Sequence, residues 1–287
     1  MAQVHLDNSL IATLDESNLT AQIVESPDAK GDVVVPKAVQ HQSKQYIITS
    51  IEDCAFVDNT NIKSLSFAAD SAVRRIGGSV FMSSSISSIK LPPSIEELAV
   101  DWCYLTRELV HLELPSNIKH LKYVDGNYLI GGDQFDTLLF VRRNFEGKFV
   151  VPSGIKKIGN SAFYGCTKLT SVSYASPCVI EKFDMYAFCE CSSLTSIQDV
   201  PPTLTEVDNQ CFMDATSLSD IKFLGENVVL GDNSFYQCYQ LKNVSFPNAK
   251  HVTIGIEAFH DAEDVNVVTP PGVTAEYRKP IVQDYSD

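Results

Sequence analysis

The chain has 287 residues, of which 44% are apolar, and this composition supports a folded core and excludes disorder over most of the chain. Its 36 Asp and Glu against 22 Lys and Arg give a net charge of −14, which argues against nucleic acid or an anionic membrane surface as a partner. Because no stretch approaches the roughly 18–20 consecutive apolar residues of a membrane helix, and the start of the chain is acidic, we expect a soluble chain without membrane segment or secretory signal.

A pattern with a period of about 24 residues recurs along most of the chain. Residues 158–172 and 230–244 align without gaps on the template I-G-x-x-A-F-x-x-C-x-x-L-x-x-V. A unit this short cannot bury its own apolar face, so successive units must stack and share a core. We therefore predict a curved, mainly β solenoid of nine turns over residues 51–270, with the leading apolar position at Ile51, Ile76, Leu98, Leu121, Ile158, Phe183, Val207, Leu230 and Ile254.

Each turn also contains a short strand pattern, L-x-x-V-x-F/L, as in residues 62–67 and 109–114. Alternating apolar side chains point into the core, which predicts that strands of successive turns form one long parallel sheet. The rest of the turn is too short for a long helix, so we expect short strands or 3₁₀ turns on the outer face.

The template I-G-x-x-A-F-x-x-C-x-x-L resembles the BspA-like leucine-rich repeats of the Treponema pallidum type, found in oral bacteria and in protozoa such as Trichomonas and Entamoeba. The resemblance covers roughly residues 31–270 and extends to two parts outside the repeats. It implies an N-terminal hairpin, formed by residues 31–36 and 45–51, that caps the core within an N-terminal segment over residues 1–50. It also implies a β-insertion at about 122–154, built from residues 125–130, 137–141 and 148–152, and leaves residues 271–287 as a C-terminal tail.

Family members are mostly surface proteins implicated in adhesion, and the resemblance therefore implies a cell-surface protein that binds a host matrix or cell-surface protein. The alternative is an intracellular leucine-rich-repeat scaffold or regulator, which the missing signal and the cysteine usage favour. The tail shows no evident cap, so it either folds over the last turn or leaves the end open for an end-to-end homodimer.

The outward positions of the predicted strands form a ladder of short polar side chains, which we call the sheet face. Leucine-rich repeats commonly bind protein ligands on this sheet, although the same residues could serve only to keep the face soluble. The sheet face comprises Ser64, Ser66, Lys90, His111, Glu113, Ser171, Ser173, Ser196, Gln198, Asp220, Lys222, Asn243 and Ser245.

A second column follows the A-F pair of each turn, and we call it the edge stripe. If it is exposed, such a row of Tyr and Met is an amphipathic surface that a partner could bury, whereas the alternative is local packing over the neighbouring turn. Its candidate binding residues are Met82, Tyr104, Tyr164, Met213 and Tyr236. Arg142, Arg143 and Lys148 in the insertion are a further small basic cluster in a predicted hairpin loop.

No pattern in the chain indicates catalysis, a metal or a cofactor. The Cys slot of the template alternates with Ala, which is typical of a small buried apolar position, so Cys166, Cys191 and Cys238 are predicted to lie in the core, as are Cys103 and Cys211. The six His lack metal-ligand spacing, and no nucleophile elbow, P-loop or dinucleotide motif is present. We expect a protein that is not an enzyme.

Overall fold

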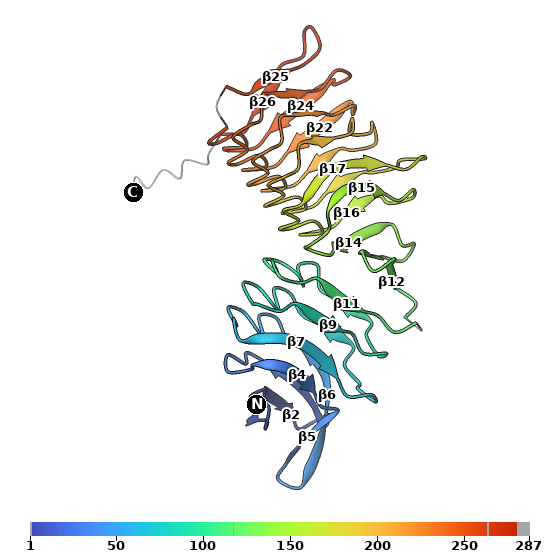
Figure 1. The fold of residues 1–287 in the computed structure, drawn as a ribbon, viewed down its shortest axis with the longest axis vertical. Coiled ribbons are helices and arrows are strands. Elements are labelled where there is room, and N and C mark those ends of the chain that lie inside the picture. The colour runs from blue at the N-terminus through green and yellow to red at the C-terminus, as the bar shows by residue number, and fades with distance from the viewer. Residues whose placement is uncertain (1, 117, 263, 280–287) are drawn as a thin grey trace, which may run out of the picture. The chain divides into compact units, whose positions relative to one another are not determined.

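The computed structural model describes residues 2–116, 118–262 and 264–279, which contain β-strands, turns and no helix. The chain divides into two compact units (Figure 1). Unit 1 comprises Met1–Phe145 with Asn160–Gly165, and unit 2 comprises Glu146–Gly159 with Cys166–Asp287.

Unit 1 begins with an antiparallel meander of three strands, followed by coils that alternate between two sheets. One sheet has the order β1-β2-β3-β6-β8-β10, and the other is the parallel sheet β4-β7-β9-β11. These strands are β1 (Ala2–His5), β2 (Ile11–Asp15), β3 (Thr20–Val24), β4 (Gly31–Val35), β5 (Ala38–His41), β6 (Lys44–Ile51), β7 (Ile62–Phe67), β8 (Arg75–Ile76), β9 (Ser88–Lys90), β10 (Glu97–Leu98) and β11 (His111–Glu113).

The N-terminal hairpin differs from the predicted one. Its antiparallel partners are β5 and β6, whereas β4, which we expected to form its first arm, pairs in parallel with β7. A strand pair joined by a tight turn needs few intervening residues, and Gln42 and Ser43, both with positive φ, supply that turn between β5 and β6. The coil therefore already begins at β4, before residue 51.

The insertion is a second antiparallel meander in unit 1. It consists of β12 (Leu121–Val124), β13 (Tyr128–Gly131) and β14 (Thr137–Val141). Residues 148–152, predicted as its last arm, instead fall largely in β15 (Gly147–Val151), which pairs in parallel with β17 of unit 2. The prediction of one long parallel sheet is therefore wrong in one respect: the L-x-x-V strands form a four-stranded sheet in unit 1 and a six-stranded sheet in unit 2.

Unit 2 consists of coils whose strands alternate between two parallel sheets, and it confirms the predicted solenoid fold. The L-x-x-V strands form the sheet β15-β17-β19-β21-β23-β25, and the leading positions lie on the strands β16, β18, β20, β22, β24 and β26. These are β16 (Lys157–Ile158), β17 (Leu169–Tyr174), β18 (Lys182–Phe183), β19 (Ser196–Ile197), β20 (Glu206–Val207), β21 (Asp220–Lys222), β22 (Asn227–Leu230), β23 (Asn243–Ser245), β24 (His251–Ile254), β25 (Asn266–Val268) and β26 (Ala275–Tyr277).

The outer turns owe their shape to two left-handed residues four positions apart. In one turn Asn233 and Gln237 have φ values of 53° and 57°, a region that short polar residues and Gly tolerate better than branched ones. Between them the amide of Phe235 donates to the carbonyl of Ala258 in the next turn at 2.8 Å. The turns thus stack through backbone bonds, as strands do, without a helix.

A column of phenylalanine rings fills the core beneath these turns. In unit 2 the rings of Phe188, Phe212, Phe235 and Phe259 stack with centroid separations of 5.0, 4.9 and 5.7 Å along the column. In unit 1 Phe56 and Phe81 stack in the same way at 5.7 Å. Each stacked ring removes a large apolar surface from water, so the column is a principal source of stability.

Candidate protein-binding surfaces

In unit 1 the strands bring the predicted sheet-face residues into two rows. Ser64 pairs with Ser88, which pairs with His111, and Lys90 pairs with Glu113. Their side chains are half-buried or exposed, because the residues that alternate with them on each strand are buried. The ammonium of Lys90 lies 2.9 Å from the carboxylate of Glu113, so the second row ends in an exposed ion pair.

A hollow of about 350 Å³ lies in unit 1 beside this second row. Lys90 and Glu113 form part of its lining, together with residues that follow the strands β7, β9 and β11. Most of the lining is apolar: Phe67, Ala68, Ala69, Leu91, Pro92, Pro93, Leu114 and Pro115. The prolines end the strands and leave apolar surface at this rim.

In unit 2 the sheet face is longer and more polar. One row runs through Ser171, Ser196, Asp220 and Asn243, each paired with the next in register. The other row includes Lys222 and Ser245, which are paired, while Ser173 lies opposite Val150 on β15. Gln198 is exposed just beyond the end of β19, where its side chain accepts a bond from the amide of Tyr174.

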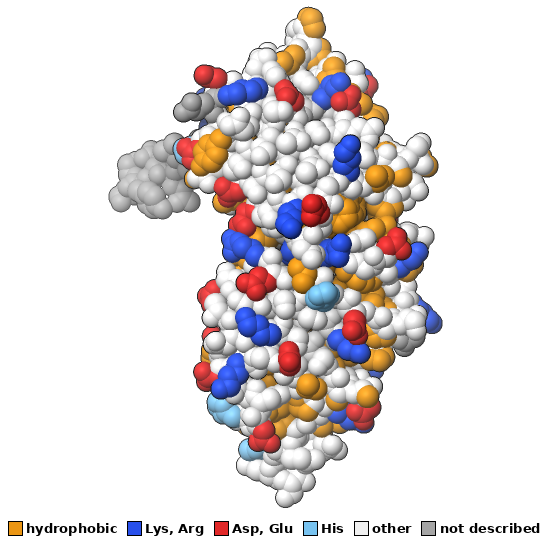
Figure 2. Space-filling view, in the orientation of Figure 1, with side chains coloured by type: hydrophobic (Ala, Val, Ile, Leu, Met, Phe, Trp, Pro, Cys, Tyr) orange, Lys and Arg blue, Asp and Glu red, His pale blue; other side chains and the backbone are white. Residues whose placement is uncertain are grey.

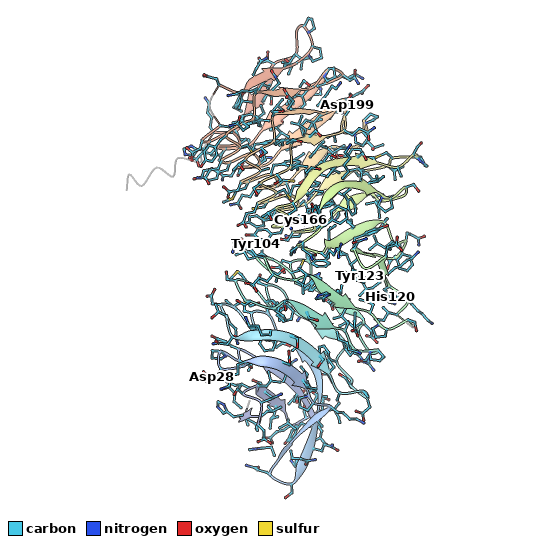
Figure 3. The ribbon with its side chains drawn as sticks, viewed as in Figure 1. Asp28, Tyr104, His120, Tyr123, Cys166 and Asp199 are labelled. Atoms are coloured by element: carbon cyan, nitrogen blue, oxygen red, sulfur yellow. The ribbon has the colours of Figure 1, made fainter. Side chains whose placement is uncertain are left out.

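Five of these residues line one polar hollow of about 390 Å³. They are Ser196, Asp220, Lys222, Asn243 and Ser245, with Thr195, Asp199 and Ser219 beside them. Lys222 is held by an ion pair of 2.6 Å to Asp199, which is labelled in Figure 3. The hollow therefore carries both hydrogen-bond donors and acceptors, and charges of both signs.

A chain of side-chain hydrogen bonds orders the first row of unit 2. Asn243 Nδ2 donates to Asp220 Oδ1 at 2.6 Å, and Asn266 Nδ2 donates to Asn243 Oδ1 at 3.3 Å. The bonds from Asn243 and Ser219 lower the pKa of the Asp220 carboxyl, so Asp220 presents a fixed negative charge at neutral pH. Figure 2 shows Lys and Arg scattered among Asp and Glu on the face in view, without one charged patch.

The strands that open each sheet, β4 and β15, were predicted as parts of the hairpin and the insertion and were therefore left out of the sheet face. Asp32 extends the first row of unit 1, and its carboxylate accepts a bond of 2.6 Å from Ser64. Val34 and Val150 occupy matching positions in unit 1 and unit 2, and both are about half exposed, at 50% and 54%. A signal was present in the repeated pattern G-x-V/F-V-V-P at residues 31–36 and 147–152.

The edge stripe is only partly exposed, and the prediction that Tyr164 contributes to a binding surface is wrong. Met82, Tyr104, Met213 and Tyr236 are half-buried, whereas Tyr164 is 1% exposed. The Tyr164 hydroxyl accepts a bond of 2.9 Å from Arg107, and its ring packs edge-on against Tyr104 at 6.0 Å. This packing removes Tyr164 from any surface that a partner could reach (Tyr104 is labelled in Figure 3).

In unit 2 the stripe continues from Tyr236 to His260, whose rings stack in parallel at 5.4 Å. His260 is exposed and also lies 3.5 Å from the Asp261 carboxylate. The neighbouring Tyr239 is 49% exposed. This end of the stripe therefore presents aromatic surface on a turn whose backbone is fixed.

Arg143 is buried rather than part of a solvated basic loop. Its side chain, 3% exposed, stacks over the ring of Phe140 at 4.8 Å. The guanidinium donates to the carbonyl of Val141 at the end of the meander and to backbone carbonyls on two turns of unit 1: Cys103, Thr106, Ser161 and Ala162. Arg143 thus stabilises unit 1 and is removed from the candidate binding residues.

The cysteines confirm the predicted core slots. Cys103, Cys166, Cys191, Cys211 and Cys238 are all fully buried. Burial raises the pKa of the Cys238 thiol to about 12, which keeps it protonated and unreactive at neutral pH. Within the residues that the structure describes, no group of three His, Cys, Asp or Glu is arranged to hold a metal ion.

A profile of the BspA type leucine rich repeat region matches residues 39–124 and 137–272 in six copies. The chain belongs to this family. The match covers most of the coils of both units and leaves out residues 125–136, which contain the middle strand of the meander, β13. No curated protein matches the sequence.

Solved structures with the same fold come from bacteria. A leucine-rich repeat protein from Eubacterium ventriosum is 16% identical with a TM-score of 0.65, and the alignment covers 94% of this chain and 85% of that one. The pneumococcal vaccine antigen PcpA is 15% identical with a TM-score of 0.57, covering 97% of this chain and 88% of that one. At these identities the BspA-type chain shares a fold with both proteins.

Proposed function

We propose that this BspA-type chain is a non-enzymatic cell-surface adhesion molecule that uses its sheet faces to bind a host matrix or cell-surface protein. The polar hollow of unit 2 carries the proposal, because it gathers five predicted binding residues on a rigid parallel sheet. Family membership and the likeness to a protein described as a vaccine antigen support a surface role. No described segment forms a helix long and apolar enough to cross a membrane.

The chemistry of the two hollows favours a protein ligand. The donors and acceptors of the polar hollow in unit 2 match the amide and hydroxyl groups of a polypeptide, and the apolar hollow of unit 1 matches a hydrophobic side chain. Nucleic acid remains a poor ligand, because the pairs Lys222–Asp199 and Lys90–Glu113 neutralise the cations of the sheet faces.

The edge stripe, now without Tyr164, is a second surface in the proposal. Met82 and Tyr104 belong to unit 1, and Met213 and Tyr236 belong to unit 2. Half-buried Tyr and Met side chains provide adaptable apolar contact at interfaces. The prediction for this surface is that Tyr236→Ser weakens ligand capture while leaving the thermal unfolding of unit 2 nearly unchanged.

The test is capture of purified extracellular-matrix proteins by the immobilised full chain. The double variant Asp220→Arg with Lys222→Glu reverses two of the three charges that line the polar hollow, and we expect it to weaken capture at least tenfold. Lys250→Glu is the matched control, because Lys250 forms an exposed ion pair with Glu226 on another surface. Equal loss with the control, or capture unaffected by the double variant, contradicts a role for this hollow.

An intracellular scaffold is the second candidate, favoured by the eight cysteines, whose side chains are thiols. Free thiols are typical of a reducing compartment, whereas secreted proteins tend to pair them. Surface labelling of intact cells distinguishes the two functions. Labelled protein supports adhesion, and an unlabelled cytosolic pool supports the scaffold.

A second copy of the chain is a further candidate partner, as an end-to-end homodimer. The tail does fold onto the last turn through β26, which pairs with β24. Among the described residues no strand pairs with the far side of β26, so self-association through this edge is part of the proposal.

A further inference from the structure

The last coil of unit 2 leaves the end of the core only half covered. Four core positions of the preceding coil, Phe235, Cys238, Leu241 and Val244, are fully buried. Their equivalents in the last coil, one repeat later, are all half-buried: Phe259, Ala262, Val265 and Val267. Apolar surface of this kind at the end of a repeat array requires a cover.

Strand β26 forms the open edge beside this surface. The amide of Arg278 donates to the carbonyl of Ile254 on β24 at 2.8 Å. Because successive residues of a strand direct their backbone groups to opposite sides, the N–H and C=O of Tyr277 point toward the open edge. The side chain of Tyr277 is 57% exposed. Tyr277 pairs with Ile254, the leading residue of the coil before it, and Ile254 is buried.

The charges of β26 are arranged symmetrically about Tyr277. Glu276 precedes it and Arg278 follows it, and both side chains are exposed. If two copies of β26 pair antiparallel with Tyr277 at the centre, Glu276 of each copy lies opposite Arg278 of the other. Opposite charges on directly facing residues stabilise a strand pair, whereas like charges destabilise it.

We infer that the chain forms a symmetric dimer with a second copy of itself through the β26 edge, with Tyr277 at the two-fold axis. The inference deepens the proposed self-association and is independent of the ligand that the sheet faces bind. In this arrangement the two Tyr277 residues exchange backbone hydrogen bonds, and two Glu276–Arg278 pairs flank them. The half-covered apolar ends of the two cores approach one another.

The symmetry of the charges selects a second copy over other occupants. A strand from an unrelated protein would need its own complementary charges, whereas this edge supplies both halves of the pair. Arg278 also lies 3.7 Å from the Asp232 carboxylate of its own chain, an exposed contact that orients the guanidinium without burying it. Glu276 has no ion pair of this kind among the described residues.

Sedimentation of the full chain over a range of concentrations tests the inference. We expect a monomer–dimer equilibrium in the native protein, and Glu276→Arg should weaken it at least tenfold because Arg then faces Arg278 of the second copy. Adding Arg278→Glu to that variant restores opposite charges and should restore dimerisation. Glu181→Arg, on an inner coil, is the matched control and should not change the equilibrium.

A cross-link locates the two-fold axis. Tyr277→Cys should form a covalent dimer under mild oxidation, because paired residues that exchange hydrogen bonds have Cα atoms about 5.5 Å apart, within disulfide reach. Glu276→Cys should not, since its partner is Arg278. Thermal unfolding of each variant verifies that the monomer is intact.

Three outcomes overturn the inference. They are a native chain that stays monomeric at every concentration, a dimer unaffected by Glu276→Arg, and a monomer that dimerises only after residues 280–287 are deleted. The last outcome would assign the edge to the chain's own C-terminal segment. None of these results affects ligand capture by the sheet faces, so failure here is distinguishable from failure of the adhesion proposal.

Discussion

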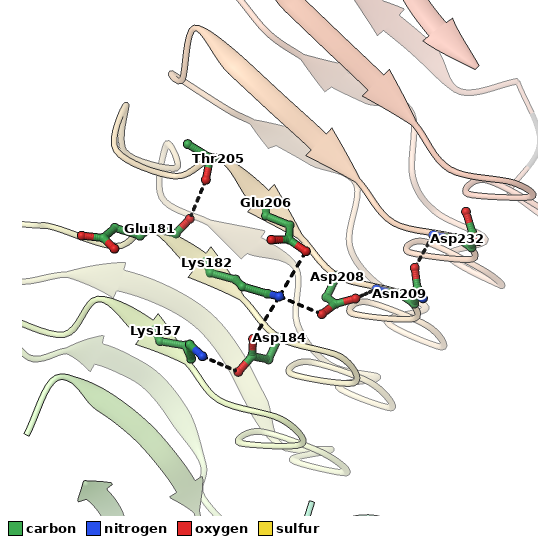
Figure 4. A network of polar contacts seen from close by, with 9 residues as sticks. All are labelled: Lys157, Glu181, Lys182, Asp184, Thr205, Glu206, Asp208, Asn209 and Asp232. Atoms are coloured by element: carbon green, nitrogen blue, oxygen red, sulfur yellow. Dashed lines mark hydrogen bonds and ion pairs between the residues drawn. The ribbon is translucent and has the colours of Figure 1, made fainter. Parts of the chain in front are cut away.

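The ammonium nitrogen of Lys182 lies 3.0 Å from a carboxylate oxygen of Asp208, one coil further along unit 2. The same ammonium is 3.1 Å from Glu206 and 3.6 Å from Asp184, and Figure 4 shows these contacts spanning successive turns. Bonds to Asp208 and Glu206 outweigh the partial burial of Lys182 and raise its pKa. Lys182 therefore connects three carboxylates that would otherwise repel one another.

Replacing Lys182 by Met should lower the free energy of unfolding by about 1–3 kcal/mol, because it leaves the buried Asp184 with only Lys157 as a cation. Urea denaturation measures the change. Lys250→Met is the control: its ion pair with Glu226 is exposed, and its loss should cost no more than about 0.5 kcal/mol. Equal effects of the two variants would show that the network adds nothing beyond a surface ion pair.

Two carboxyls should change stability with pH in opposite directions. Burial raises the pKa of Asp184, so its contribution to stability is present below its unfolded pKa and is lost as pH rises through the folded pKa. Bonds from the Gly78 amide and Arg75 lower the pKa of Asp53, so its contribution is present above its unfolded pKa and is lost as pH falls through the folded pKa.

Unfolding of Asp184→Asn and Asp53→Asn across the acid range measures both effects. On acidification, the native protein should gain stability relative to Asp184→Asn and lose stability relative to Asp53→Asn. Slopes of the same sign would contradict the assigned causes of the two pKa shifts.

The repeat template predicted the coils because one pattern of buried positions satisfies both the strands and the turns. It also placed Ser171, Ser196, Asp220 and Asn243 on one row, since residues in the same template slot share a register. Tyr164 is an exception to this rule, because it shares a template position with the half-buried Tyr236 and yet is buried.

The exceptions depend on contacts between residues far apart in sequence. Tyr164 is covered by Arg107, 57 residues away, which no repeat position specifies. Arg143 looked like a loop residue because two adjacent basic residues usually remain solvated. Its carbonyl partners lie on two turns and at the end of the meander, and the period of the repeats does not specify how the meander packs against those turns.

Adjacent glycines in unit 1 should differ sharply in their tolerance of Ala. A Cβ on Gly77 would overlap the backbone of Asp53 and lie 2.6 Å from the carbonyl carbon of Glu52, whereas one on Gly78 would meet the side chain of Asp101. Gly77→Ala should therefore lower the unfolding free energy by about 2–3 kcal/mol, and Gly78→Ala by less than about 1 kcal/mol. Thermal and urea unfolding compare them, and equal losses would contradict the close stacking of backbones at this turn.

The thiols should react according to their exposure. Cys54 is exposed and Cys178 is half-buried, while the remaining six are buried. Burial and nearby carboxylates raise the pKa of Cys54, so even this thiol should react slowly at neutral pH and faster as pH rises. Mass spectrometry after alkylation should find Cys54 labelled first in the native chain and all eight labelled after denaturation. Early labelling of Cys211 or Cys238 would contradict the tight core.

Arg143 is expected to be the least replaceable charged residue of the insertion. Its guanidinium donates to the carbonyls of Thr106 at 3.0 Å and Cys103 at 3.1 Å, and also to those of Ser161 and Ala162. Arg143→Met would remove the guanidinium donor from each of these buried carbonyls and should cost about 3–5 kcal/mol, although the carbonyls of Cys103, Ser161 and Ala162 also accept from other groups. Arg143→Lys keeps the charge but not the planar fork, so an intermediate loss is expected.

Denaturation measures the loss of stability in the Arg143 variants, and hydrogen exchange of the folded protein locates it. Amides of the meander, including that of Val141, which donates to the Ala162 carbonyl at 2.8 Å, should exchange faster in Arg143→Met. Lys148→Met is the control, because Lys148 is exposed on β15 and its loss should change the unfolding free energy by no more than about 0.5 kcal/mol. If Arg143→Met unfolds like this control, the guanidinium does not hold the meander to its turn, and the buried position of Arg143 has another cause.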